Sequence, residues 1–402
     1  MSSSSRILRS IAGCVVLLGA CSPAPSHAPD ALPPTPTFVL ATLPPNLTPV
    51  PLSTAIASAE PLPTWAWVQA EVRDPPARGE IDHLWTLPGA SIAAWSDETN
   101  DGGGTSTLFV SADGVNWELA PFAEPGFLAE HGTVVDGELT VIGNIGPAQD
   151  PERQVWTTTD GRRWTRLEGV DGLAFGAGRV QALVTSDAGW LAAGVEFVNP
   201  ELHRTHVLQS PDRIVWKEIG GPVSDLDFAS DGHRTVAPGV SESDRFPFPH
   251  TVAWSDDART WTEAIVAVLG RFESGGVIGA SSGGFAMAGQ RFKPEDESSH
   301  AIGWWSTDGA TWQPSTFQVL NGPAGEAAPR EMIGTDDGLI ARGNGDPLAN
   351  AIWISDVGRT WQQVAPLPPG EITAFARDGD AILIATQPGS GPGVLWRGTA
   401  MP

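Results

Sequence analysis

The stretch Ser111–Trp117, SADGVNW, decides the fold, because close copies of it recur along the chain. In each copy a Ser or Thr is followed six positions later by a Trp, with an Asp and usually a Gly between them. Successive Trp residues lie 45 to 52 positions apart. A repeat of this length indicates an array of similar structural units. The other five copies begin at Thr158, Ser210, Ser255, Ser306 and Ser355.

Each unit shows the same order of short β-strand patterns. An apolar strand ends at a turn rich in Gly and Asp, and a second strand follows, as in SIAAW from Ser91 and ELTVIG from Glu138. A polar loop, a third strand, the repeated hairpin and a fourth strand complete the unit. Gly and Asp accept the dihedral angles of tight hairpins, and no segment shows sustained helical periodicity. Four antiparallel strands per unit are typical of a β-propeller blade.

The second strand of the unit occurs seven times, but the seventh unit is incomplete. After Gly393–Gly398, GVLWRG, the sequence stops at Pro402 without the hairpin or a fourth strand. The segment Thr64–Ala70, TWAWVQA, resembles the segments that follow the hairpins. We therefore expect it to supply the outer strand of the seventh blade and to close the ring. The predicted fold is an all-β, seven-bladed β-propeller over residues 64–402.

The S-x-D-G-x-x-W pattern resembles the Asp-box, or BNR repeat, found in sialidases, sortilin-type receptors, some xyloglucanases and photosystem II assembly factors. The Asp is expected to accept hydrogen bonds from turn N–H groups, and the Trp to bury a large apolar area between blades. In these families the hairpins lie away from the ligand site. The resemblance therefore implies structural roles for Asp113, Trp117, Asp160, Trp164, Asp212, Trp216, Asp257, Trp261, Asp308, Trp312, Asp356 and Trp361.

Three copies depart from the pattern. Arg213 and Ala258 stand where the third and fourth copies would have Gly. The sixth copy has Asp356 one position early and Val357 at the usual Asp position. We expect the turns of these three copies to differ slightly from the others.

The N-terminal residues 1–20 have the pattern of a secretion signal. Two Arg residues precede Ile11–Leu18, an apolar run too short to span a bilayer stably. The next residues, Leu18 to Cys21, resemble the lipobox of bacterial lipoproteins, which implies cleavage before Cys21 and its acylation. The alternative is an ordinary secretory peptide with an incidental Cys. We expect a lipid-anchored protein of the cell envelope that faces the periplasm or the exterior.

Residues 21–63 follow the acylated Cys as a Pro-rich segment with much Ala, Thr and Ser. Such a composition cannot bury enough apolar surface to fold, and Pro favours an extended chain. We predict a disordered linker that reaches on the order of 100 Å from the membrane.

The composition limits the classes of partner and cofactor. A formal net charge of −24 makes nucleic acid and anionic lipid headgroups poor partners for the bulk surface. The acidic surface can also serve solubility alone. The only two Cys residues are Cys14 and Cys21, so the mature chain can form no internal disulfide. We expect no cofactor and no metal site, and a monomer.

Three neighbouring blades carry the richest loops between their second and third strands, at residues 196–206, 241–250 and 290–300. In a propeller these loops share the face opposite the hairpins. Their cationic and aromatic side chains could form one patch for a glycan, a small anionic ligand or a protein segment. The alternative is that longer loops simply carry their own small cores. The candidate binding residues are His203, Arg204, His206, Arg245, Phe246, Phe248, His250, Arg291, Phe292 and His300.

The residues favour a binding or scaffold module over an enzyme. The resemblance to sialidases implies a Tyr nucleophile, yet the chain contains no Tyr. A glycoside hydrolase that uses a carboxylate pair remains an alternative, although the acidic residues are too many and too scattered for one pair to be chosen. A second alternative is an assembly factor for a membrane complex. Fold alone does not decide among these functions.

Overall fold

The computed structural model describes residues 37–39, 55–57, 63–98, 104–122, 124–146, 151–173, 175, 178–199, 202–219, 227–239, 248–269, 273–293, 298–319, 327–335, 337–345, 349–389 and 391–401. Within these residues the regular secondary structure consists of β-strands. They include no helix of the length and hydrophobicity that crossing a membrane requires. The predicted signal and Cys21 lie outside the described residues.

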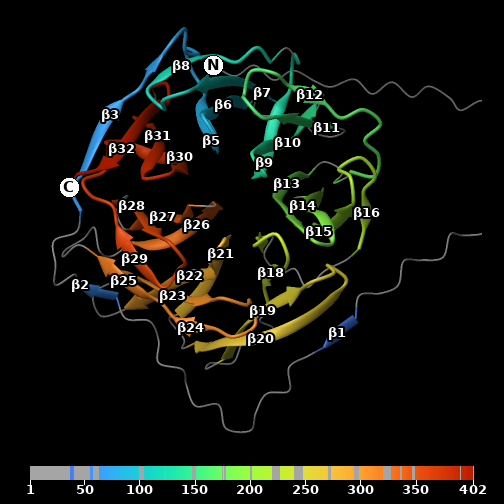
Figure 1. The fold of residues 1–402 in the computed structure, drawn as a ribbon, viewed down its shortest axis with the longest axis vertical. Helices are drawn as coiled ribbons and strands as arrows, with labels where there is room; N and C mark the ends of the chain where they lie inside the picture. Colours follow the sequence, from blue (N-terminus) through green and yellow to red (C-terminus); the bar gives the residue numbers. More distant parts are fainter. Residues whose placement is uncertain are drawn as a thin grey trace, which may run out of the picture. The chain divides into compact units, whose positions relative to one another are not determined.

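The described strands form seven sheets arranged in a ring, which is a seven-bladed β-propeller (Figure 1). The all-β, seven-bladed fold predicted from the repeat is therefore confirmed. The first three blades, each given from its inner to its outer strand, follow one another along the chain. Blade 1 contains β5 (Glu80–Leu87), β6 (Ala90–Glu98), β7 (Gly104–Ser111) and β8 (Asn116–Leu119). Blade 2 contains β9 (Leu128–Val135), β10 (Glu138–Ile145), β11 (Glu152–Thr158) and β12 (Thr165–Arg166). Blade 3 contains β13 (Arg179–Ser186), β14 (Gly189–Asn199), β15 (Leu202–Ser210) and β16 (Lys217–Glu218).

The remaining blades repeat this antiparallel order. Blade 4 contains β17 (Ala229–Ser230), β18 (Thr235–Pro238), β19 (Phe248–Ser255) and β20 (Thr260–Leu269). Blade 5 contains β21 (Glu273–Ser281), β22 (Gly284–Lys293), β23 (Ser298–Ser306) and β24 (Gln313–Pro314). Blade 6 contains β26 (Ala328–Thr335), β27 (Gly338–Gly345), β28 (Ala349–Ser355) and β29 (Thr360–Gln363). Blade 7 contains β30 (Glu371–Asp378), β31 (Ala381–Gln387), β32 (Val394–Ala400) and β3 (Trp65–Gln69).

The N-terminal strand β3 closes the ring, as the incomplete seventh unit predicts. It pairs antiparallel with β32, with Trp65 opposite Ala400 and Gln69 opposite Trp396. The two ends of the propeller thus lie side by side in one sheet (Figure 1). The Trp65 side chain is buried in the cluster between blades 6 and 7. Strand pairing and side-chain packing therefore both join the first residues of the propeller to the last.

Apolar packing between the blades forms the core. Among the described residues there are seven buried clusters, one at each blade-to-blade interface. Trp117, for example, packs with Phe109 of its own blade and Leu383 of blade 7. Burial of such large aromatic side chains supplies much of the hydrophobic stabilisation of a fold without disulfides.

The repeated Ser/Asp/Trp hairpins share one network of local hydrogen bonds. In the first copy the N–H groups of Val115 and Asn116 donate to Asp113 Oδ1 over 2.9 and 2.7 Å. Trp117 Nε1–H donates to the carbonyl of Gly114 over 3.1 Å. The backbone N–H of Asn116, above all, holds the pKa of Asp113 well below its usual range. The carboxylate is thus occupied in fixing its own turn.

The third and fourth copies keep this turn, although we expected them to differ. Arg213 and Ala258 adopt the positive φ angles, 67° and 59°, that Gly provides elsewhere. Their carbonyls still accept the N–H of Trp216 and Trp261, over 2.9 and 3.1 Å. The rigid frame of the hairpin therefore overrides the preference of these two residues for negative φ.

The sixth copy does differ. Its turn carbonyl, that of Gly358, accepts a hydrogen bond from Ser315 Oγ over 2.6 Å, and the buried Trp361 Nε1 has no hydrogen-bond partner within the described residues. The Trp361 ring instead stacks on Phe317. Asp356 is exposed and contacts Arg377 over 3.6 Å. A neighbouring segment thus replaces the local network that the usual Asp supplies.

Additional parallel strands cover the outer edges of three blades. Strand β4 (Glu71–Val72) pairs with β8, and β25 (Thr316–Val319) pairs with β29. Strand β1 (Thr37–Val39) lies along β20, and β2 (Ala55–Ala57) lies along β25. Strands β1 and β2 belong to the segment predicted as a disordered linker, so the structure departs from that prediction at these residues. The outer edge of a blade has unpaired backbone N–H and C=O groups, which can pair with any short chain segment that contains no Pro.

Deleting residues 64–70 should lower the thermal unfolding midpoint of the whole propeller, because blade 7 loses its outer strand and the buried Trp65. Thermal unfolding followed by circular dichroism measures this midpoint. The Val68→Ser variant is the control, since Val68 is 53% exposed on the same strand, and its free energy of unfolding should change by less than about 0.5 kcal/mol. An unchanged midpoint after the deletion would contradict the closing role of β3.

Candidate functional site

Six of the seven inner strands contain a register shift at the same place, near the start of the strand. In each case the inner strand has one residue more than its partner strand, so the ladder is locally interrupted. Such β-bulges redirect side chains and are common at the rims of closed sheets and beside functional sites. The bulged residues are Asp82, Glu130, Gln181, Gly276, Arg330 and Thr373.

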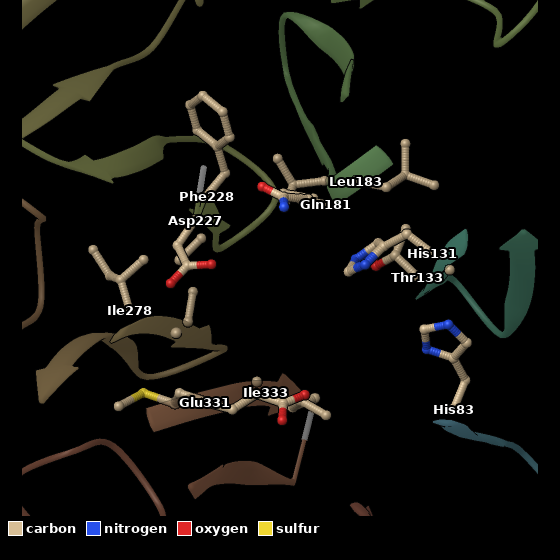
Figure 2. A pocket seen from close by; sticks show the side chains of 18 of the residues that line it. His83, His131, Thr133, Gln181, Leu183, Asp227, Phe228, Ile278, Glu331 and Ile333 are labelled. Atoms are coloured by element: carbon tan, nitrogen blue, oxygen red, sulfur yellow. The ribbon is translucent and has the colours of Figure 1, made fainter. Parts of the chain in front are cut away.

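A cavity of about 410 Å³ lies along the axis of the ring, and all seven blades contribute to its wall. The residues after the bulges of blades 1, 2, 3, 6 and 7 occupy equivalent positions on this wall. Blades 3 and 7 have Ala there, which leaves the space open, and the equivalent Val277 of blade 5 packs between blades 5 and 6. Figure 2 shows four polar side chains at this level, and we call them the polar ring: His83, His131, Asp227 and Glu331.

The two imidazoles of the polar ring lie on one side of the cavity (Figure 2). The His83 ring stacks on Trp85 with a centroid distance of 5.2 Å. Burial, together with the neighbouring His83, lowers the pKa of His131 to about 3, so its ring is uncharged at neutral pH. Within the described part of the chain the His131 ring makes no hydrogen bond. Its ring nitrogens, one donor and one acceptor, are therefore available to a molecule in the cavity.

The two carboxylates of the polar ring come from the other blades. Asp227 lies across the cavity from the imidazoles, and Glu331 lies on the adjoining wall (Figure 2). Glu331 Oε2 contacts Arg342 Nη2 over 2.8 Å. Arg342 belongs to the second strand of blade 6 and does not line the cavity. The wall therefore combines carboxylate acceptors with uncharged groups that can both donate and accept.

A buried ion pair holds the wall beside His131. Glu130 Oε2 lies 3.4 Å from Arg153 Nε, and the two side chains are only 4% and 3% exposed. Glu130 also accepts hydrogen bonds from Asn144 Nδ2 over 2.6 Å and from the N–H of Val180 over 2.9 Å. Because Val180 belongs to blade 3, this carboxylate joins blades 2 and 3 at the bulge that precedes His131. A buried pair needs such additional hydrogen bonds to offset its desolvation.

Two residues of the first predicted loop are held by contacts with carboxylates. His206 contacts Glu196 over 3.1 Å through Nε2 and Glu218 over 3.0 Å through Nδ1. Arg204 is exposed and contacts Glu196 over 3.3 Å. Both side chains thus converge on Glu196, an arrangement that stabilises the β14–β15 hairpin itself. The side chain of His203, also in β15, is not among those that the structure describes.

His250 lies inside the protein, although we expected it in the exposed patch. Its ring is buried, lies against Trp304, and has Nε2 3.2 Å from the sulfur of Met287. Burial lowers the pKa of His250 to about 4. The side chain therefore belongs to the packing between blades 4 and 5. His250 was a candidate because it adjoins a long loop in the sequence. It lies in β19, where alternate side chains point into the protein, and this explains why it is buried.

The remaining predicted residues that the structure describes lie on β19, β22 and β23. Arg291 and His300 are half-buried, and Phe292 is 37% exposed. Arg291 pairs with His300 across the β22–β23 hairpin. Phe248 pairs with Leu269 in the β19–β20 ladder, but its side chain is not described. Arg245 and Phe246 lie outside the described residues. The described candidates do not line the cavity.

The bulges lie at the end of the ring where the second-to-third strand loops also lie, because the start of each inner strand pairs with the end of its second strand. The polar ring nevertheless does not come from these loops: His83, His131 and Glu331 lie on inner strands, and Asp227 lies two residues before β17. Aligning the repeats on their first strands could have revealed it. His83, His131, Asp227 and Glu331 occupy the position where the other three blades have Ala or Val.

Comparisons with known proteins give the fold alone. No protein-family model matches the chain, and no curated protein matches it. The β-propeller domain of the trilobed protease from Pyrococcus furiosus, described as having an open velcro topology, is 10% identical, with a TM-score of 0.48 over 80% of this chain and 95% of that chain. The Bombyx mori β-fructofuranosidase BmSUC1 is 13% identical, with a TM-score of 0.33 over 81% and 93%. Zg3597 from Zobellia galactanivorans, a family 117 glycoside hydrolase, is 8% identical, with a TM-score of 0.33 over 60% and 89%. At these values no property of those proteins is carried over to this chain.

Among the described residues, no group of three or more His, Cys, Asp or Glu side chains is placed to hold a metal ion.

Replacing Glu130 with Gln should lower the free energy of unfolding by about 3 kcal/mol, because the buried Arg153 loses its counter-charge. Urea denaturation measures the change. The Glu118→Gln variant is a matched control, since Glu118 and Arg162 are 44% and 49% exposed, and it should cost less than about 1 kcal/mol. Equal effects of the two substitutions would contradict the role assigned to the Glu130–Arg153 pair.

Proposed function

We propose that this protein is a non-catalytic binding module that holds a small polar ligand in the central cavity. The observation that carries the proposal is the polar ring, which places four hydrogen-bonding side chains at one level of a cavity that every blade lines. Inner strands of a closed propeller are rigid, so the site is formed before the ligand arrives and little ordering entropy is lost on binding. A volume of about 410 Å³ fits a ligand of the size of one or two sugar units.

Aromatic and apolar side chains complete the proposed site. Trp85, Phe228 and Met332 line the cavity together with the polar ring. A ligand with a polar edge and an apolar face could use both kinds of wall. The Asp-box resemblance of the hairpins supports the same view, since it assigns their acidic residues to the turns rather than to a reaction.

A glycoside hydrolase is the second candidate, because Asp227 and Glu331 both line the cavity. Such enzymes need one carboxyl group as the acid and a second as base or nucleophile. Glu331 is already engaged by Arg342, whose Nη2 lies 2.8 Å from Glu331 Oε2. The lack of any Tyr argues against the sialidase mechanism in particular.

Screening the purified full chain against a panel of glycans and small polar metabolites tests the two candidates, with binding and turnover measured separately. We expect binding without turnover. The Thr133→Trp variant should abolish binding, because Thr133 lies on the cavity wall (Figure 2) and a Trp there would fill it. A Trp is tolerated at the equivalent position of blade 1, where Trp85 stands. Hydrolysis that is lost in an Asp227→Asn variant would instead establish the enzyme.

We further propose that the module is attached to a membrane by acylation of Cys21, with the propeller facing the periplasm or the exterior. The Leu-Gly-Ala-Cys pattern at residues 18–21 supports this proposal. In a bacterial host the wild-type chain should sediment with the membrane fraction, and the Cys21→Ser variant should move to the soluble fraction or remain unprocessed. Equal distribution of the two chains would contradict the anchor.

A further inference from the structure

The charges on the cavity wall are unequal. Asp82, Asp227 and Glu331 contribute carboxylates, whereas Arg330 contributes the one guanidinium among the residues that line the cavity. Arg330 is exposed and donates a hydrogen bond to Gln290 over 3.1 Å, which engages it with the neighbouring blade 5. The formal net charge of −24 for the whole chain adds to the negative potential at such a concave site.

His131, on the side of the cavity opposite Asp227, adds no positive charge that would repel a bound cation. That ring is uncharged at neutral pH and has no hydrogen-bond partner within the described residues. It lies half-buried on the cavity wall, next to the His83–Trp85 stack. The ring nitrogens fit a hydroxyl group, because a hydroxyl can both donate and accept.

The aromatic rings near the cavity belong mainly to the packing between blades. Phe228 is 7% exposed, its ring lies 6.0 Å from that of Trp261, and Figure 2 shows it pointing away from the cavity. Trp85 is also 7% exposed and stacks on His83. Recognition of a ligand is therefore left chiefly to the polar side chains of the wall.

From this arrangement we infer that the ligand of the cavity is a small hydroxylated molecule with a protonated primary amine, such as an amino sugar or an amino alcohol. The inference rests on the proposed function, since it specifies the ligand class of the same site. Asp227 binds the ammonium group, and His131 exchanges hydrogen bonds with a hydroxyl group.

Binding of matched pairs of compounds tests this ligand class. The probes are glucosamine against glucose, and 2-aminocyclohexanol against cyclohexane-1,2-diol, at pH 6 and low ionic strength, by isothermal titration calorimetry with the full chain. Each amine should bind at least about tenfold more tightly than its neutral partner. Raising the salt concentration should reduce this preference, because screening weakens the attraction between charges.

Substitutions locate the effect. Asp227→Asn should remove most of the preference for the amine while the neutral partner keeps its affinity within about twofold. Asp136→Asn is the control, since it removes one negative charge from an exposed hairpin turn that is not part of the cavity wall, and it should leave the preference unchanged. His131→Phe should weaken both members of each pair, because the hydroxyl group loses its partner.

The outcomes separate this inference from the proposed function. Equal affinity for amines and neutral partners, or a preference that survives in Asp227→Asn, would overturn the inference and leave a binding module for uncharged ligands. If the Thr133→Trp variant still binds amines and neutral partners as tightly as the wild-type chain, the site lies elsewhere. That result would overturn both proposals. Failure of every probe and of the wider panel to bind would likewise overturn both.

Discussion

Packing between neighbouring blades is the constraint on which the rest of the structure depends. A four-stranded blade alone cannot bury both faces, so each blade needs a neighbour on either side. The seven interblade clusters supply this burial, and the one between blades 6 and 7 includes Trp65 of β3, the strand that completes the last sheet. Closure also fixes the distances among the inner strands. The cavity and its polar ring are thus a consequence of how the blades meet.

The sequence predicts the fold well because the fold is repeated. Each Ser/Asp/Trp hairpin is a local structure whose hydrogen bonds connect residues two or three positions apart, so a short motif contains all that is needed. The closing strand was also predictable, since Thr64–Ala70 resembles the strands that follow the hairpins. The strands β1 and β2 were not, because three-residue strands have no periodicity of their own and form only on an edge that the folded propeller provides.

The candidate site was harder to predict for a physical reason. Loops stand out in a sequence by length and composition, and the loop containing Arg204 and His206 drew attention for that reason. The structure shows that His206 is held between Glu196 and Glu218, while His250 packs inside the core. His131, by contrast, lies in an inner strand and Asp227 two residues before one, and only the ring geometry brings them to one cavity. Convergence of residues about 100 positions apart is a tertiary property that spacing along one chain does not reveal.

The position of β1 shortens the free chain between the proposed lipid anchor at Cys21 and the propeller. The pairing of Thr37 with Thr260 attaches the chain to blade 4 only 16 residues after Cys21. Even a fully extended chain of that length spans at most about 55 Å, which is roughly half the reach of a wholly free linker up to residue 63. The protein would then sample only a thin layer above the bilayer, and its local concentration for membrane-bound molecules would rise accordingly. Ligands attached to the same membrane, rather than those that diffuse freely, would meet the propeller most often.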